Sequence, residues 1–282
     1  MQGVPRGARP GYRAAASMSR VRLDSLLADR GLFDSRSRAA AAVLAGDVLL
    51  LPGRRRADKP GQLVAEDVEL EVVAPPPFVS RGGVKLANAL DALGVDVAGR
   101  RALDVGASTG GFTDCLLQRG AEHVVAVDVA YGELHWSLRE DPRVTVLERV
   151  NARALSVDQL PWRPDLVVAD VSFISLAKVL PAVLACSAER FDALAMVKPQ
   201  FEVGRAALGK GGVVRDPALR RGALVAVAAA AREAGASVLG FASSGLPGPK
   251  GNLETFVHLA EAGRAGALED VAAAALAAEP DA

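Results

Sequence analysis

Four ionisable residues stand at predicted element ends. Asp170 ends the apolar run in "VVADVSF", and Lys198 ends the apolar run in "LAMVKPQFE". Lys85 follows a glycine pair in "VSRGGVKLANAL", where a helix begins, and Glu254 opens the strand in "GNLETFVHL". Because functional groups of an open α/β sheet gather at the carboxyl ends of its strands, we expect a buried quartet of two cations and two anions there.

Such a quartet suits a reaction in which a hydroxyl group must lose its proton. A hydroxyl is a poor nucleophile at neutral pH, and a lysine can act as its base if burial and a neighbouring cation lower the lysine pKa. We assign this role to Lys198 and the positioning of the hydroxyl to Lys85, while Asp170 and Glu254 orient the ammonium groups. The reaction needs no metal, and the sequence offers no His or Cys ligand set for one.

A glycine-rich turn in "LDVGASTGGFTD", residues 103–114, follows an apolar strand and opens a helix. Its glycines are Gly106, Gly110 and Gly111, so the middle glycine of the dinucleotide fingerprint G-x-G-x-x-G is missing. The turn also lacks the lysine of a phosphate-binding P-loop. A nucleoside without phosphates, such as S-adenosylmethionine, is the remaining ligand, although a plain strand-to-helix turn fits the same residues.

Residues after the next two strands extend this candidate cofactor site. Asp128 ends the second strand, where a carboxylate can accept hydrogen bonds from ribose hydroxyls of either a nicotinamide or an adenosylmethionine cofactor. Asn151 follows the third strand and can meet an adenine edge. The candidate residues for S-adenosylmethionine are Asp104, Gly106, Ser108, Thr109, Gly110, Gly111, Phe112, Asp128 and Asn151.

The residues after Asp170 argue against an amine as the group that is modified. Amino-methylating enzymes of this fold commonly have Pro-Pro-aromatic at this point, whereas this chain has Val-Ser-Phe. A ribose 2′-hydroxyl suits the lysine base better. We therefore expect in-line transfer of the methyl group of S-adenosylmethionine to a 2′-hydroxyl.

The elements that position these residues follow from the hydrophobic pattern. Strands that alternate with helices predict a parallel α/β sheet. The strands are expected at 101–107, 123–129, 144–149, 165–171, 192–199, 237–242 and 254–260, and the helices at 85–94, 111–120, 174–187 and 216–235. Seven strands with the last two close together indicate the Rossmann-like α/β sheet of S-adenosylmethionine-dependent methyltransferases.

Two long connections lie beside the predicted site. The loop 202–217 carries Arg205, Lys210 and Arg215, and "SSGLPGPKGN" precedes the last strand. Long loops in compact domains are often functional. We predict that both form a lid or an RNA-contacting segment.

The first 60 residues are basic, although the whole chain has no net charge. They hold 12 Lys and Arg against 5 Asp and Glu, and the other 222 residues hold 21 against 28. A basic module joined to a domain that is not basic indicates a polyanionic partner.

This basic region has the pattern of a small α+β domain. Leu23, Leu26 and Leu27 share one helical face, a second helix begins at Asp34 or Ser35, and a strand, a basic turn and an alternating strand follow. Basic residues on adjacent elements favour phosphate contacts over a merely solvated surface. The candidate RNA-binding residues are Arg22, Arg36, Arg38, Arg54, Arg55, Arg56, Lys59 and Arg81.

The domain boundaries follow from these patterns. The chain is predicted to comprise a disordered extension at 1–19, the small domain at 20–73, a proline-stiffened linker at 74–80, the cofactor domain at 81–262 and an alanine-rich tail at 263–282. The extension has no apolar core, so it is no secretory signal, and Met18 is an alternative start. The apolar runs of the whole chain fall short of the roughly 18 to 20 residues of a membrane span, and the chain's two cysteines, Cys115 and Cys186, suit a reducing cytoplasm.

Taken together, the motifs of residues 20 to 260 resemble the hemolysin A, or TlyA, family of ribosomal RNA 2′-O-methyltransferases. The resemblance rests on "VSRGGVKL", "LDVGASTGGFTD", "AVDV", "ADVSFISL", "MVKPQFE", "KGGVVRDP" and "GNLETF" in this order. It implies that Lys85, Asp170, Lys198 and Glu254 match a catalytic Lys-Asp-Lys-Glu tetrad. It also implies a cytidine substrate in ribosomal RNA of the small subunit, the large subunit or both.

The small domain resembles a known RNA-binding module named after a small-subunit ribosomal protein (the S-four type), through "RLDSLLADRG", "SRSRAA" and "AGDVLL". Three alternatives stay open. The chain could be a ribosome-binding protein with a degenerate cofactor domain, a membrane-lysing protein as the historical family name suggests, or a small-molecule methyltransferase. The basic module argues against the last of these.

Overall fold

The computed structural model describes residues 20–33, 35–73, 77–204 and 207–279. The predictions for the extension 1–19, for Asp34 and for part of the linker lie outside these residues. By its internal contacts the chain divides into two compact units, Met1–Pro75 and Pro76–Ala282.

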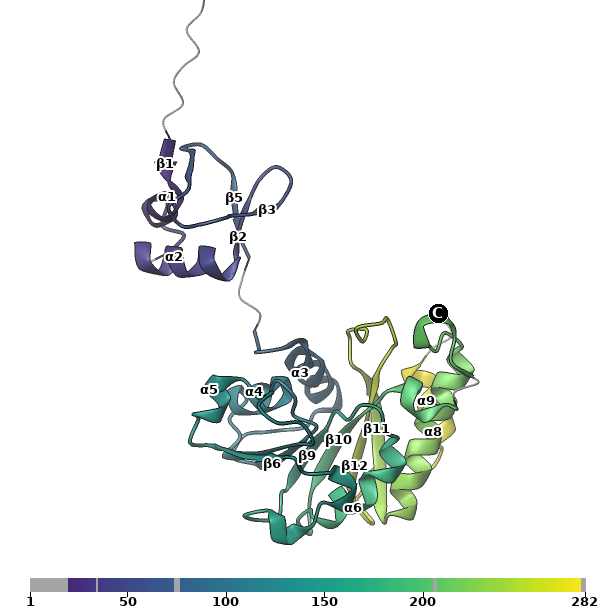
Figure 1. Cartoon of the computed structure of the whole chain (residues 1–282). Helices are drawn as coiled ribbons and strands as arrows, with labels where there is room; N and C mark the ends of the chain where they lie inside the picture. Colours follow the sequence, from purple (N-terminus) through teal and green to yellow (C-terminus); the bar gives the residue numbers. More distant parts are fainter. Residues whose placement is uncertain (1–19, 34, 74–76, 205–206, 280–282) are drawn as a thin grey trace, which may run out of the picture. The chain divides into compact units, whose positions relative to one another are not determined.

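The first unit combines two helices with two small sheets (Figure 1). Leu23, Leu26 and Leu27 are buried in its core, as their helical spacing predicts, and the Ser35 hydroxyl caps the second helix. In chain order the elements are β1 (Arg20–Arg22), α1 (Leu23–Asp29), α2 (Arg36–Ala45), β2 (Val48–Leu50), β3 (Arg55–Arg56), β4 (Leu63–Ala65) and β5 (Leu70–Val72).

Three of these strands were not predicted from the sequence. β1 and β4 pair with each other, and β3 lies within the predicted basic turn, where it pairs with β2. Each is only two or three residues long and is rich in arginine or partly exposed. Such short strands form because a segment distant in the chain completes their hydrogen bonds. They are too short to show the alternation of apolar and polar residues from which a strand is predicted.

The second unit is built on one seven-stranded sheet, which confirms the predicted Rossmann-like fold (Figure 1). Its strand order is β11-β12-β10-β9-β6-β7-β8, and β12 runs antiparallel to both of its neighbours. The strands are β6 (Arg101–Val105), β7 (His123–Asp128), β8 (Val144–Glu148), β9 (Leu166–Ala169), β10 (Asp192–Val197), β11 (Ala236–Ser243) and β12 (Thr255–Glu261).

The helices of the second unit lie on both faces of this sheet. They are α3 (Arg81–Leu93), α4 (Gly111–Gln118), α5 (Trp136–Arg139), α6 (Leu180–Ala185), α7 (Pro199–Glu202), α8 (Pro217–Glu233) and α9 (Val271–Ala278). α3 begins at Arg81, earlier than expected, and Gly83 in its first turn lies so close to the Phe78 ring that a side chain there would overlap it. In the alanine-rich tail, α9 buries Val271 and Ala275.

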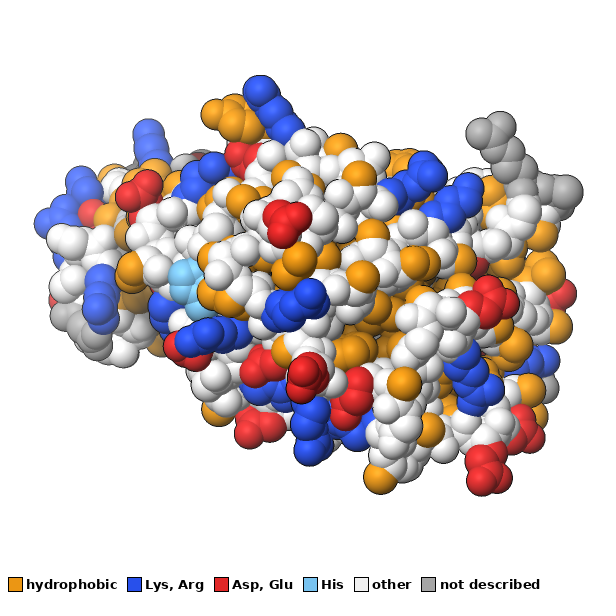
Figure 2. All heavy atoms as spheres, turned by 90° about the horizontal axis from the view of Figure 1, so that it is seen from below, with side chains coloured by type: hydrophobic (Ala, Val, Ile, Leu, Met, Phe, Trp, Pro, Cys, Tyr) orange, Lys and Arg blue, Asp and Glu red, His pale blue; other side chains and the backbone are white. Residues whose placement is uncertain are grey.

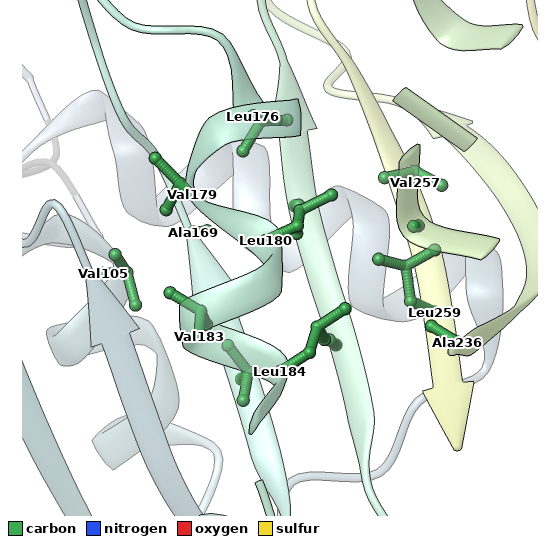
Figure 3. Packing of buried hydrophobic residues seen from close by; sticks show 14 of the residues in the cluster. Val105, Ala169, Leu176, Val179, Leu180, Val183, Leu184, Ala236, Val257 and Leu259 are labelled. Carbon is green, nitrogen blue, oxygen red and sulfur yellow. The ribbon is translucent and has the colours of Figure 1, made fainter. Parts of the chain in front are cut away.

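The core on one face of the sheet is formed by α6, α8 and α9. Figure 3 shows Leu180, Val183 and Leu184 of α6 over the part of the sheet near Ala169 of β9, and Val257 of the same cluster lies two strands away on β12. On the other face, α3 and α4 contribute a second cluster that includes Leu86, Leu90 and Leu116. A parallel sheet that is covered on both faces needs strands that are apolar throughout, which explains the continuous apolar runs of the sequence.

No helix in the described ranges is long and apolar enough to cross a membrane. On the face of the molecule seen in Figure 2, acidic and basic side chains are interspersed among smaller hydrophobic groups.

Truncating Leu180 tests the packing of α6. Its side chain is 2% exposed, so Leu180→Ala should lower the free energy of unfolding of the second unit by about 2 to 5 kcal/mol. Both tryptophans, Trp136 and Trp162, lie in this unit, so their fluorescence during urea titration reports on it alone. The control is Leu276→Ala on α9, whose side chain is 49% exposed and whose loss should change stability by less than about 0.5 kcal/mol. Equal effects of the two substitutions would contradict the packing.

Candidate active site

The glycine turn follows the carboxyl end of β6 and contacts the carboxyl end of the neighbouring strand β9. Gly106, directly after β6, has a φ of +84°, and a Cβ atom there would lie 2.5 Å from the carbonyl oxygen of Asp170. Gly111 approaches Ser80 and Gly83 so closely that a side chain would overlap them. Glycine is therefore required by backbone contact, on one side with the strand end that bears Asp170 and on the other with the start of α3.

Asp128 fixes the conformation of this turn. Its Oδ2 accepts a hydrogen bond from the Ser108 N–H at 2.7 Å, and its Oδ1 accepts one from the Ala130 N–H at 2.7 Å. Ser108 has a φ of +48°, which is uncommon for a residue with a side chain. Each carboxylate oxygen keeps a further lone pair, and Asp128 lines the cavity described next.

A cavity of about 480 Å³ lies between the ends of β6, β7, β8 and β9. Asp128 and Asn151 line it, and the Asn151 Oδ1 also accepts the Arg153 N–H at 3.1 Å. The apolar walls of this cavity were not predicted from the sequence, because single apolar residues after a strand end show no periodic pattern. These walls include Val129, Val150, Ala152, Val171, Ile174 and Val179.

A second cavity, of about 510 Å³, contains all four members of the predicted quartet. Lys85, Asp170, Lys198 and Glu254 line it together with Gly106. It shares Gly106, Ser108 and Asp170 with the first cavity, so the two form one continuous cleft. Of the other cofactor candidates, Thr109, Gly111 and Phe112 line this cleft.

The quartet consists of two ion pairs. The Lys85 ammonium pairs with the Glu254 carboxylate, and both residues are buried. The Lys198 ammonium pairs with Asp170 and also donates a hydrogen bond to the Ser172 hydroxyl at 2.9 Å. Each ammonium group is thus paired with a carboxylate, because an unpaired charge in this cavity would cost free energy of desolvation. The pairing also holds the four side chains in place.

A third cavity, of about 370 Å³, adjoins the quartet through Lys198 and Glu254. Leu208 and Gly212 come from the predicted lid loop, and Pro249 comes from the connection before β12. Both connections therefore contribute residues to this cavity, and their role as a lid or an RNA-contacting segment stays a prediction. Arg205 lies outside the described residues, and Arg215 is exposed.

Asn252 holds the two connections together. It is 2% exposed, its Oδ1 accepts the Val214 N–H at 2.9 Å, and its Nδ2 donates to the Gly212 carbonyl at 3.0 Å. Sequence analysis missed Asn252, because an asparagine after a glycine in a loop is also an ordinary turn residue.

Phe173 is a second residue that sequence analysis missed as a site residue. Its side chain is 91% exposed, its φ is +64°, and its ring centroid lies 5.2 Å from that of Phe201. A bulky residue with positive φ at a cavity rim is a strained conformation of the kind found at functional sites. The exposed ring lines both the first and the third cavity.

Two cofactor candidates, Gly110 and Asp104, line none of the three cavities described above. A Cβ atom on Gly110 would overlap the Leu138 and Leu134 side chains. Asp104 is fully buried in β6 beneath the glycine turn, where it accepts a hydrogen bond from the Thr113 hydroxyl at 2.7 Å. Burial raises the pKa of this carboxyl to about 7.

The basic candidates fall in two places. Arg81 begins α3 in the second unit and donates to the Pro247 carbonyl at 3.0 Å. Arg54 pairs with Glu71 at 2.7 Å, and Arg55 pairs with Asp58 at 3.5 Å. The candidates in the first unit are all exposed: Arg22, Arg36, Arg38, Arg54, Arg55, Arg56 and Lys59.

Comparison with known proteins agrees with this fold and cleft. Residues 78–261 match the model of the FtsJ-like methyltransferase family. The chain is 53% identical over 244 residues to the 16S/23S rRNA (cytidine-2'-O)-methyltransferase TlyA of Mycobacterium tuberculosis, covering 85% of this chain and 90% of the relative. It is 37% identical over 239 residues to Hemolysin A of Brachyspira hyodysenteriae, and the match covers 84% of this chain and 99% of that relative.

A solved structure from Streptococcus thermophilus, described as a candidate hemolysin, aligns with a TM-score of 0.69 and 37% identity, covering 93% of this chain and 96% of that one. Fold, cleft and family match thus define a methyltransferase of the FtsJ-like family. Within it, the chain belongs to the TlyA, or hemolysin A, family, which confirms the resemblance drawn from its motifs.

The raised pKa of Asp104 predicts a pH-dependent stability. The native carboxyl binds its proton more tightly than the unfolded chain does, so its contribution is complete below about pH 4 and is lost as the pH rises through about 7. Between pH 5 and 8 the wild type should lose on the order of 3 kcal/mol more of its free energy of unfolding than Asp104→Asn. Urea titrations followed by tryptophan fluorescence measure the difference. Parallel pH profiles would show that Asp104 does not titrate in this window.

Proposed function

We propose that this chain transfers the methyl group of S-adenosylmethionine to the 2′-hydroxyl of a cytidine in ribosomal RNA. The observation that carries the proposal is the quartet, in which two lysine–carboxylate pairs line the same cleft as the glycine turn. Relatives named as ribosomal RNA methyltransferases support the substrate class.

The cleft offers residues that suit each part of S-adenosylmethionine. The turn from Gly106 to Gly111 would hold the methionine end, and the Asp128 carboxylate would accept hydrogen bonds from the ribose hydroxyls. The apolar walls around Val129 and Val150, with Asn151 between strand ends, suit an uncharged adenine ring. When bound there, the cofactor supplies an activated methyl group.

The quartet can prepare the hydroxyl for attack. Lys198 would accept the proton of the 2′-hydroxyl as the oxygen forms its bond to the methyl carbon. Lys85, held by Glu254, would donate a hydrogen bond to the same oxygen and orient it. Asp170 and Ser172 keep the Lys198 amino group at the cleft.

The third cavity supports the assignment of a nucleotide as the methyl acceptor. It lies next to Lys198 and Glu254 and carries the exposed Phe173 ring on its rim. Nucleic acid bases stack on such exposed aromatic rings. Gln200 adds a side-chain amide to the lining of this cavity that can contact a base edge.

The first unit supports RNA as the larger partner. Its seven exposed basic candidates lie on a domain that is itself too small to contain the reaction site. Arginine and lysine side chains that contact phosphates supply affinity independent of sequence. We infer that this unit binds the ribosomal RNA and that the second unit performs the chemistry.

Replacement of Lys198 tests the proposed base. Lys198→Ala should lower kcat by about 100-fold or more, because general-base catalysis typically contributes 10²- to 10⁴-fold. Cofactor affinity should change little, since the turn and Asp128 remain. Isotope-labelled methyl transfer to purified ribosomal subunits, with mapping of 2′-O-methyl positions, measures the rate, and calorimetry measures S-adenosylmethionine binding.

The matched control is Lys178→Ala, which removes an exposed lysine away from the cleft and should keep the wild-type rate. A Lys198→Ala protein that binds the cofactor and methylates RNA at the wild-type rate would eliminate Lys198 as the base.

Replacement of Phe173 tests the stacking surface. Phe173→Ala should lower kcat/KM for RNA by about 5- to 150-fold, which corresponds to the ~1 to 3 kcal/mol of one stacked base. Phe173→Tyr keeps the ring and should keep most of the activity. Steady-state kinetics with ribosomal subunits distinguish the two variants, and an alanine variant with unchanged kcat/KM would show that no base stacks there.

A further inference from the structure

The first unit contains a buried carboxylate among its exposed arginines. Asp24, the second residue of α1, is 4% exposed. Its Oδ1 accepts Arg22 Nε at 3.1 Å, and its Oδ2 accepts Arg22 Nη2 at 2.8 Å and Arg36 Nε at 3.0 Å. Asp24 therefore binds two of the candidate RNA-binding arginines at once, one from the end of β1 and one from the start of α2.

Both arginines are held and yet remain accessible. The side chain of Arg22 is 49% exposed and that of Arg36 is 55% exposed. Each guanidinium group has N–H donors beyond those that contact Asp24. A planar guanidinium whose Nε side is bound to a carboxylate still presents donors that match a phosphate.

A glycine close to the guanidinium group also constrains Arg22. A Cβ atom on Gly61 would lie 3.0 to 3.2 Å from the Arg22 guanidinium atoms. The turn between β3 and β4 thus leaves room for this group, while Asp24 bonds it in place. Fixed side chains lose less conformational freedom on binding than mobile ones, which favours affinity.

We propose that Asp24 is a positioning residue for RNA binding, which holds Arg22 and Arg36 at a fixed spacing so that both bind phosphates of the RNA backbone. The inference rests on the proposed function, in which the first unit binds ribosomal RNA. A positioning role and a purely electrostatic effect of Asp24 predict opposite changes in RNA affinity when its charge is removed. Removal of a negative charge should strengthen RNA binding if charge alone matters, whereas it should weaken binding if Asp24 positions the arginines.

The test compares two acidic residues of the same helix in the full-length protein. Asp24→Asn keeps the side-chain shape but removes the charge that binds both arginines, and Asp29→Asn removes an exposed charge at the other end of α1. Dissociation constants for in vitro transcribed ribosomal RNA are measured over a series of potassium chloride concentrations. Thermal unfolding and S-adenosylmethionine binding are measured on the same samples.

Asp24→Asn should weaken RNA binding by about fivefold or more, and the slope of log K against log salt should fall by about 1 for each phosphate contact that is lost. Asp29→Asn should bind RNA as tightly as the wild type or slightly more tightly. A merely structural role for Asp24 would lower the unfolding temperature without changing the salt slope of the folded protein.

A second variant keeps the proposal testable if Asp24→Asn fails to fold. Arg22→Lys combined with Arg36→Lys preserves every charge and leaves Asp24 in place, but it removes the planar donor groups. It should also bind RNA more weakly. Wild-type affinity in either variant, with an unchanged salt slope, would overturn the positioning role of Asp24. A wild-type protein that does not bind ribosomal RNA at all would instead refute the proposed function itself.

Discussion

The carboxyl ends of β6 and β9 approach each other so closely that Gly106 has no room for a side chain against the Asp170 carbonyl. This contact places the glycine turn beside the strand end that carries a member of the quartet. In the proposed reaction the acceptor oxygen must lie next to both the methyl donor and the quartet, and adjacent parallel strands bring the residues proposed for the two roles together. The other parts of the site are arranged around this junction.

The Lys85–Glu254 pair connects the start of the second unit with its last strand. Glu254 precedes β12, which inserts antiparallel between β10 and β11, and Lys85 lies on α3 ahead of the first strand of the sheet. A buried ion pair of this kind tolerates few alternatives, because loss of either partner leaves an uncompensated charge. The cost of burying two charges offsets much of their attraction, and a pair of apolar residues would stabilise the same positions at least as well.

Much of the second unit could be predicted from the sequence, and the reason is visible in particular residues. The apolar runs of β7, β9 and β10 are continuous because both faces of each strand are covered. Lys198 and Asp170 interrupt such runs at strand ends, which marks them as candidate site residues. Phe173, Asn252 and the apolar walls around Val129 could not be predicted in this way, since their importance comes from neighbours that are distant in the chain.

The sequence by itself determined the alternation of strands and helices, the glycine turn and the four ionisable residues, because each depends on local spacing or on residue type. Only the tertiary structure decided which lysine pairs with which carboxylate, that two loops meet through Asn252, and that Asp24 joins two arginines. These contacts link residues from separate elements, and their partners are selected by packing and by the need to compensate buried charge. Neither packing nor charge compensation produces a periodic pattern in the sequence.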